Sequence, residues 1–131
     1  MADKRIIVAA VCFQDDSGRV LTVRKRGTAR FILPGGKLRP TEGLASAAVR
    51  EVREELGLEL ALVDLAWLGT WTALAANEPD HHVIATVFSA LLPGTPRASA
   101  EIDEVQWVDP AGHEGLPVAP LLRDFVLPSV A

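Results

Sequence analysis

The first strongly apolar stretch of the chain covers residues 5–13 and is rich in β-branched side chains, which predicts a buried strand. Residues 15–18 predict a turn, and the alternating residues 20–24 are predicted to return as the antiparallel hairpin partner of the first strand. A short strand is predicted at residues 31–33, where it stops at the Pro-Gly-Gly of residues 34–36. The first quarter of the chain therefore predicts part of a β-sheet.

A helical period follows this β-rich stretch. The helix is predicted to begin at Gly43 or Leu44 and to end at Leu56, with Gly57 as its stop because glycine readily adopts the left-handed conformation. The residues predicted to form its buried stripe are Ala45, Ala48, Val49, Val52 and Leu56. At ~100° per residue, this stripe lies beside the acidic face of the helix rather than across from it. The helix can therefore pack on a sheet while its acidic edge lines a cleft.

The second half of the chain alternates between strand and loop patterns. Strands are predicted within residues 60–72, 82–91 and 105–108, with a loop at 93–96 and an amphipathic C-terminal helix within 116–128. A mixed sheet packed between helices follows from this order. The predicted fold class is α/β, with an α/β/α layering.

Three carboxylates in the predicted helix have a spacing that suggests chemistry. Glu51, Glu54 and Glu55 stand at i, i+3 and i+4, which places all three on one helix face about one turn apart. Like charges at this spacing repel one another, whereas Mg²⁺ and Mn²⁺ are hard cations that bind carboxylate and carbonyl oxygens. A solvated acidic helix face is the alternative for the spacing alone.

The surroundings of these carboxylates favour the metal site. Residues 36–58 match the pattern G-x5-E-x7-R-E-U-x-E-E-x-G-U, in which U is a bulky aliphatic residue, at all nine specified positions. These positions are Gly36, Glu42, Arg50, Glu51, Val52, Glu54, Glu55, Gly57 and Leu58. This pattern is the Nudix box, and the chain resembles the Nudix hydrolases, especially the small MutT-like members. The resemblance implies a single Nudix domain over residues 1–131, with the mixed sheet sandwiched between helices.

The resemblance also implies an activity and a ligand set. Nudix hydrolases use Mg²⁺ or Mn²⁺ to cleave a nucleoside diphosphate linked to another group. Carried over to this sequence, Glu51 and Glu55 would be metal ligands, and Glu54 would be a further ligand or would position the attacking water. The backbone carbonyl of Gly35 would complete the set, and Glu42 would support the loop or hold an outer water.

Two further groups are predicted to take part in catalysis. Arg50 precedes Glu54 by four residues, so the pair can form on the helix surface and orient the carboxylate. The resemblance also implies an additional loop carboxylate, for which Glu101 is preferred to Glu104. For either of these, a surface acid before a strand is the alternative.

The charge distribution points to a phosphate-rich ligand. The net charge of −4 conceals a stretch, residues 17–41, that contains seven basic residues and no acid. Solvated strand edges are the alternative for several of the seven. The residues predicted to contact phosphates are Arg24, Lys25, Arg26, Lys37 and Arg39.

Composition narrows the partners and the compartment. The chain has 131 residues, 49% of them hydrophobic, which predicts one domain. Its single cysteine predicts a reducing cytoplasm. No segment reaches the length of a membrane span, and nucleic acid is not expected because there is no broad basic face. The expected partner is a small nucleotide, and the sequence leaves open whether the protein is a monomer or a homodimer.

The sequence narrows the nucleotide only by what it lacks. The chain has no SQPWPFP-like run and no tyrosine, and residues 73–76 contain no proline where the ADP-ribose branch tends to carry one. These absences favour nucleoside triphosphates, cleaved to the monophosphate and pyrophosphate. MutT reads oxidised guanine with an asparagine in its C-terminal segment, whereas residues 116–120 contain no amide side chain, so the base stays open. A non-catalytic nucleotide-binding Nudix domain is the alternative.

Overall fold

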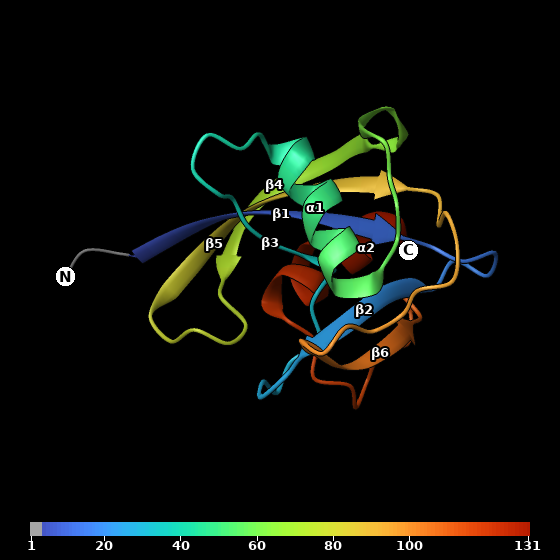
Figure 1. Ribbon diagram of the computed structural model, residues 1–131. Helices are drawn as coiled ribbons and strands as arrows, with labels where there is room; N and C mark the ends of the chain where they lie inside the picture. The colour runs from blue at the N-terminus through green and yellow to red at the C-terminus, as the bar shows by residue number, and fades with distance from the viewer. Residues whose placement is uncertain (1–3) are drawn as a thin grey trace.

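The computed structural model describes residues 4–131, which form two sheets and two helical layers (Figure 1). Its elements in chain order are β1 (Lys4–Phe13), β2 (Val20–Lys25), β3 (Gly35–Lys37), α1 (Leu44–Leu56), η1 (Leu62–Asp64), β4 (Ala66–Leu74), β5 (His81–Ala90), β6 (Ile102–Val108), η2 (Leu122–Val126) and α2 (Leu127–Val130). Within this part of the chain, no helix is long and apolar enough to cross a membrane.

The larger sheet is mixed and has the strand order β3-β1-β5-β4. Strands β1 and β5 are parallel along their full length, from the pair Lys4–His81 to the pair Phe13–Ala90. β3 pairs antiparallel with β1, and β4 pairs antiparallel with β5. A strand covered on both faces needs apolar side chains on both, which accounts for the continuous apolar run in β1.

The alternation of side chains along β1 separates two cores. Ala9, Val11 and Phe13 pack in one buried cluster with Val52 and Leu56 of α1. The residues between them, Ala10 and Cys12, belong to the other cluster, which contains side chains of the C-terminal segment such as Leu122, Val126 and Leu127. Figure 1 shows α1 on one face of the sheet and the C-terminal helices on the other. The predicted α/β/α layering is confirmed.

Helix α1 forms where the sequence predicted it. It begins at Leu44 and ends at Leu56, and Gly57 follows in the left-handed conformation with its N–H donated to the Arg53 carbonyl. Of the predicted stripe, Ala48, Val52 and Leu56 are buried, while Ala45 and Val49 are half-buried. Ala47, Arg50 and Glu55 are also buried. The stripe is therefore wider than predicted and extends into the charged face.

The predicted hairpin between residues 5–13 and 20–24 is wrong. Strand β2 does pair in an antiparallel manner, but its partner is β6, with Val20 opposite Val108 and Arg24 opposite Glu104. Only an isolated bridge between Gln14 and Val20 joins it to the end of β1. An alternating pattern identifies a strand but not its partner, and the paired residues here stand 77 to 88 positions apart in the sequence.

The segment before the helix also differs from the prediction. Residues 31–33 form only isolated bridges, from Phe31 to Val118 and from Ile32 to Val23. The Gly-Gly pair, predicted to stop a strand, instead begins β3, which lies against Val8, Ala9 and Ala10 of β1. The glycines allow this approach, because a Cβ on Gly35 would stand 2.3 Å from the Ala9 carbonyl oxygen.

Candidate active site

Strand β3 brings the Gly-Gly pair directly against the acidic face of α1. A Cβ on Gly36 would lie 2.7 Å from Cδ of Glu51, closer than side-chain carbons can stand. The backbone N–H of Gly35 donates a hydrogen bond to Oε1 of Glu55 at 3.0 Å. The helix carboxylates and the backbone that precedes the box therefore meet at one place, as the sequence predicted for a ligand site.

Glu55 is the most unusual carboxylate in this place. Its side chain is fully buried, and its Oε2 has no hydrogen-bond partner among the residues that the structure describes. The Lys25 ammonium stands 3.4 Å from Oε2, where it forms an ion pair without hydrogen-bond geometry. Burial raises the pKa of Glu55 from about 4.5 to about 7, although Lys25 and the Gly35 N–H favour the charged form. Oε2 is thus a buried carboxylate oxygen that faces the Lys25 ammonium without a hydrogen bond, an arrangement that calls for a functional explanation.

The raised pKa of Glu55 predicts how stability depends on pH when metal is removed. Between about pH 4.5 and 7 the native state holds a proton that the unfolded state releases, so native stability should fall as the pH rises through this window. We expect the urea midpoint of the wild type in chelator to decrease from pH 5 to pH 8. Glu55→Gln, which has no such proton, should show a smaller decrease, and identical pH profiles would contradict the assignment.

Arg50 connects the other carboxylates. Its Nε and Nη2 donate to the two oxygens of Glu42 at 2.7 and 2.8 Å, and its Nη1 donates to Glu51 at 2.8 Å and to Glu54 at 3.2 Å. Nη2 also donates to the Lys37 carbonyl. The predicted contact between Arg50 and Glu54 is therefore present. The same guanidinium also fixes the loop that contains Glu42.

The Glu42 carboxylate supports the loop between β3 and α1. The hydrogen bonds from Arg50 and from the backbone N–H of Arg39 lower the pKa of Glu42 to about 2. Arg39 in turn forms an ion pair with Glu54 at 3.0 Å. These contacts make Glu42 a loop support, which was one of the two roles that the resemblance implied.

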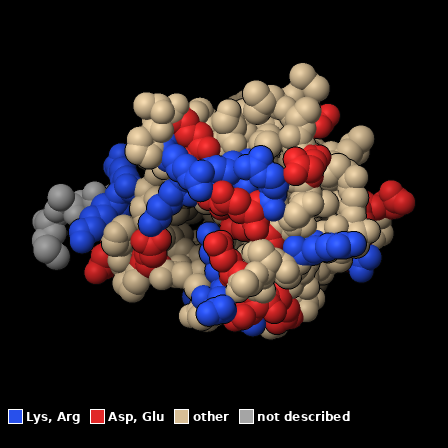
Figure 2. Space-filling model, in the orientation of Figure 1, with Lys and Arg blue, Asp and Glu red and all other residues tan. Residues whose placement is uncertain are grey.

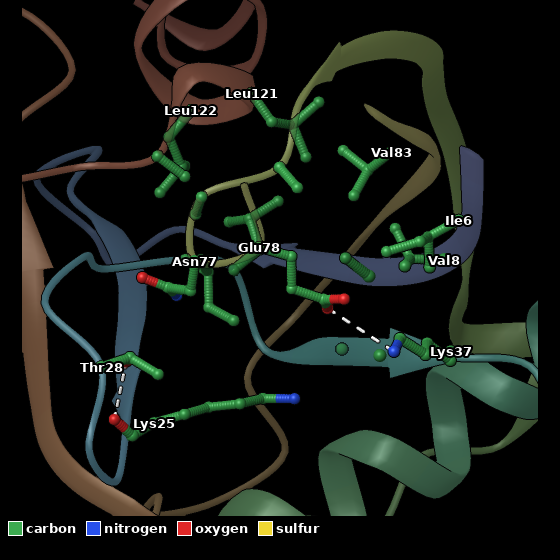
Figure 3. A pocket seen from close by; sticks show the side chains of 18 of the residues that line it. Ile6, Val8, Lys25, Thr28, Lys37, Asn77, Glu78, Val83, Leu121 and Leu122 are labelled. Carbon is green, nitrogen blue, oxygen red and sulfur yellow. Dashed lines mark hydrogen bonds and ion pairs between the residues drawn. The ribbon is translucent and has the colours of Figure 1, made fainter. Parts of the chain in front are cut away.

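A cavity of about 520 Å³ opens beside these carboxylates. It is lined by Gly35, Gly36 and Glu51 and by the predicted phosphate contacts Lys25 and Lys37 (Figure 3). On the face shown in Figure 2, carboxylates and cationic side chains gather side by side over α1 and its neighbours. The structure therefore joins a charged site to an open cavity large enough for a nucleoside.

The other predicted phosphate contacts do not line this cavity. Arg24 points to β6, where it forms ion pairs with Asp103 and Glu104 at 3.4 and 3.7 Å. Arg26 is exposed and donates to the Ala100 carbonyl, and Arg39 is held by Glu54. Of the five predicted phosphate contacts, two therefore line the cavity, Lys25 and Lys37. The other three, Arg24, Arg26 and Arg39, do not.

The two candidate loop carboxylates have different surroundings. Glu104 forms an ion pair with Arg24 and accepts a hydrogen bond from the Gln106 amide. Glu101 is exposed, and its loop runs along the end of α1, where the Ser99 N–H donates to the Glu55 carbonyl at 2.9 Å. The participation of Glu101 stays a prediction.

The fit of a divalent cation can be judged from the donors. As the side chains stand, no group of three or more His, Cys, Asp or Glu residues within 4–131 is arranged to hold a metal ion. The reason is visible in the ion pairs, because Arg50 and Arg39 occupy oxygens of Glu51 and Glu54. The donors nevertheless suit a hard cation, because they are carboxylates. One of them, Oε2 of Glu55, also has no hydrogen-bond partner among the described residues. The site fits a cation that would replace part of the guanidinium contacts.

The comparison with known families decides what this arrangement is. The family model of the NUDIX domain matches residues 3–126. The chain belongs to the Nudix family. The box around Gly36 and Glu55 is thus the Nudix box of a Nudix domain, and the resemblance noted in the sequence is confirmed.

Individual relatives are matched over only part of their length. It is 36% identical over 120 residues to an octanoyltransferase of Myxococcus xanthus, covering 87% of this chain but 33% of that protein. It is 31% identical to a MutT-like protein of Streptomyces ambofaciens, covering 80% of this chain and 64% of the relative. The chain thus spans a third of one relative and less than two thirds of the other.

A solved structure supports the same fold. The MutT NUDIX hydrolase of Burkholderia pseudomallei superposes with a TM-score of 0.81 and 24% identity, covering 98% of this chain and 99% of that one. The fold of this chain is therefore that of a MutT NUDIX hydrolase of known structure.

Two cavity residues were missed by sequence reasoning. Asn77 and Glu78 lie in the loop between β4 and β5 and line the cavity. No sequence pattern marked them, because a polar pair in a loop is ordinary. Their position depends on the return of β5 beside β1, which sequence spacing does not specify.

Proposed function

We propose that this protein is a metal-dependent nucleoside triphosphate pyrophosphohydrolase. It would convert a nucleoside triphosphate and water to the nucleoside monophosphate and pyrophosphate. The observation that carries this proposal is the buried Glu55, whose Oε2 has no hydrogen-bond partner among the described residues, beside a cavity lined by Lys25 and Lys37. Its relatives include a MutT-like protein, which supports the same class of reaction.

The proposed cofactor is Mg²⁺ or Mn²⁺, held by Glu51, Glu54, Glu55 and the Gly35 carbonyl. When bound, the cation would neutralise phosphate charge and lower the pKa of a bound water. Glu54 is half-exposed at the surface of this group, so it is placed to hold and orient the attacking water. Arg50 keeps Glu51 and Glu54 on the same side of α1.

The residues of the cavity would hold the phosphate chain. The Lys37 ammonium and the Lys25 ammonium approach from β3 and β2, on two sides of the cavity (Figure 3). The two lysines would bind the phosphate chain on one side, and the metal held by the carboxylates would bind it on the other. This arrangement favours cleavage of an inner phosphoanhydride bond. Glu101, at the end of the loop that contacts the Glu55 backbone, is proposed as the additional carboxylate in preference to Glu104. Because such nucleotides are found inside the cell, we place the activity in the cytoplasm.

Removal of the metal gives a direct test of this proposal. With each of the eight common ribo- and deoxyribonucleoside triphosphates, we expect pyrophosphate release in about millimolar Mg²⁺ or Mn²⁺ and none in excess chelator. Release is measured by a pyrophosphate-coupled assay, with and without added inorganic pyrophosphatase. Turnover that persists unchanged in chelator would contradict the proposal. Tight nucleotide binding without any release would instead support a binding domain.

A further inference from the structure

The wall of the cavity contains no aromatic side chain. The lining residues of the described chain include aliphatic side chains such as Val8, Val83, Leu121 and Leu122, but no Phe or Trp (Figure 3). Aromatic side chains near this region pack elsewhere: Phe31 is buried in the core, and Trp71 stacks on Phe125 with the ring centroids 6.1 Å apart. A base in this cavity would therefore pack between aliphatic groups, and its identity would have to be read by polar contacts.

Nearly every polar side chain of the cavity already has a partner. Lys25 pairs with Glu55, and the Thr28 hydroxyl donates to the Lys25 carbonyl at 2.7 Å. Lys37 pairs with Glu78 at 3.5 Å, and Glu51 pairs with Arg50. The carboxamide of Asn77, an exposed residue at the mouth of the cavity, is the exception, since it has no hydrogen-bond partner among residues 4–131 and can be offered to a ligand.

We propose that Asn77 is the residue that reads the nucleobase, which rests on the proposed nucleotide substrate. A carboxamide offers two N–H donors and a carbonyl acceptor side by side, the pattern that pairs with the donor and acceptor on the edge of a base. The C-terminal wall of the cavity, formed by Ala119, Leu121 and Leu122, contributes no such group. Among the described lining residues, Asn77, in the loop between β4 and β5, is the one that carries a carboxamide.

The neighbour of Asn77 holds this loop over the cavity. Glu78 forms its ion pair with Lys37 of β3, which connects the loop to the strand that begins the Nudix box. Figure 3 shows Asn77 and Glu78 extending from the same loop, with Glu78 directed to Lys37. We therefore place the base at Asn77 and the phosphates near Lys37, which the neighbouring Glu78 connects to the same loop.

The test compares ligands with and without a base. By isothermal titration calorimetry in chelator, the wild type should bind at least one of AMP, CMP, GMP and UMP about tenfold tighter than ribose 5-phosphate. Asn77→Ala should weaken the preferred monophosphate about fivefold and leave ribose 5-phosphate unchanged. Asn77→Asp, which keeps the size but loses the donors, should change which monophosphate is preferred. Circular dichroism checks that both variants are folded.

The outcomes separate this inference from the proposed function, because binding requires no turnover. If the monophosphates bind no tighter than ribose 5-phosphate, or if Asn77→Ala weakens both ligands equally, Asn77 does not read the base. If base-dependent binding requires Asn77 while no triphosphate is hydrolysed, the inference stands and the proposed hydrolysis fails.

Discussion

Glu55→Gln is expected to lower kcat for pyrophosphate release by about a thousandfold while the protein remains folded. Glutamine has almost the same shape and can still accept the hydrogen bond from the Gly35 N–H, so the contact between β3 and α1 is kept. What is lost is the negative charge at Oε2, which would help to hold the metal that neutralises the charge developing on the phosphate in the transition state. A loss of about 4 kcal/mol in transition-state stabilisation corresponds to about a thousandfold in rate.

Glu54→Gln should have a comparable effect, since its carboxylate is placed to act on the attacking water. Glu59→Gln is the matched control, because Glu59 is an exposed carboxylate just beyond the end of α1. Steady-state kinetics at saturating Mg²⁺ measures all three variants. A protein carrying both Glu54→Gln and Glu55→Gln that retained near-normal turnover would remove the catalytic role from this site.

Arg50→Met is expected to lower the free energy of unfolding by about 3 kcal/mol in chelator, because it leaves neighbouring carboxylates without their cation. Only 8% of the Arg50 surface is exposed. The side chain contacts Glu42, Glu51 and Glu54 and screens their mutual repulsion. Methionine has most of the length of the arginine side chain and keeps the apolar contacts of its aliphatic part. Urea denaturation followed by intrinsic fluorescence gives the change.

The matched control for this variant is Arg53→Met, on the exposed side of the same helix. It should change stability by no more than about 0.5 kcal/mol. Added Mg²⁺ should restore part of the stability lost in Arg50→Met, because a bound cation would again neutralise Glu51 and Glu54. Equal stabilities of the two variants would show that the Arg50 network does not contribute as described.

The sequence predicted well those features that depend on neighbouring residues in the chain. The limits of α1 follow from helical spacing and from Gly57, and the box carboxylates follow from a contiguous pattern, so neither depends on distant contacts. The partner of β2 was predicted wrongly, because alternation gives a strand its two faces but not its neighbour. Pairing with β6 joins residues that stand 77 to 88 positions apart, so it depends on the path of the intervening chain, which no local pattern encodes.

The site shows the same division. Periodicity placed Glu55 beside the buried stripe, but its complete burial arises from β3, β2 and the loop before β6 closing around it. The role of Lys25 changed for the same reason, from a predicted phosphate contact to a residue that also faces Glu55. Asn77 could not have been selected from the sequence, because only the fold brings its loop next to Lys37.

Hydrolysis in H₂¹⁸O tests the central claim most directly, because it identifies both the bond that is cleaved and the phosphorus that is attacked. The preferred triphosphate is incubated with the wild type and Mg²⁺, and the products are resolved by mass spectrometry. Attack at the β-phosphorus predicts nucleoside monophosphate without label and pyrophosphate that carries one ¹⁸O. Nucleoside diphosphate together with labelled orthophosphate as the main products would contradict the account.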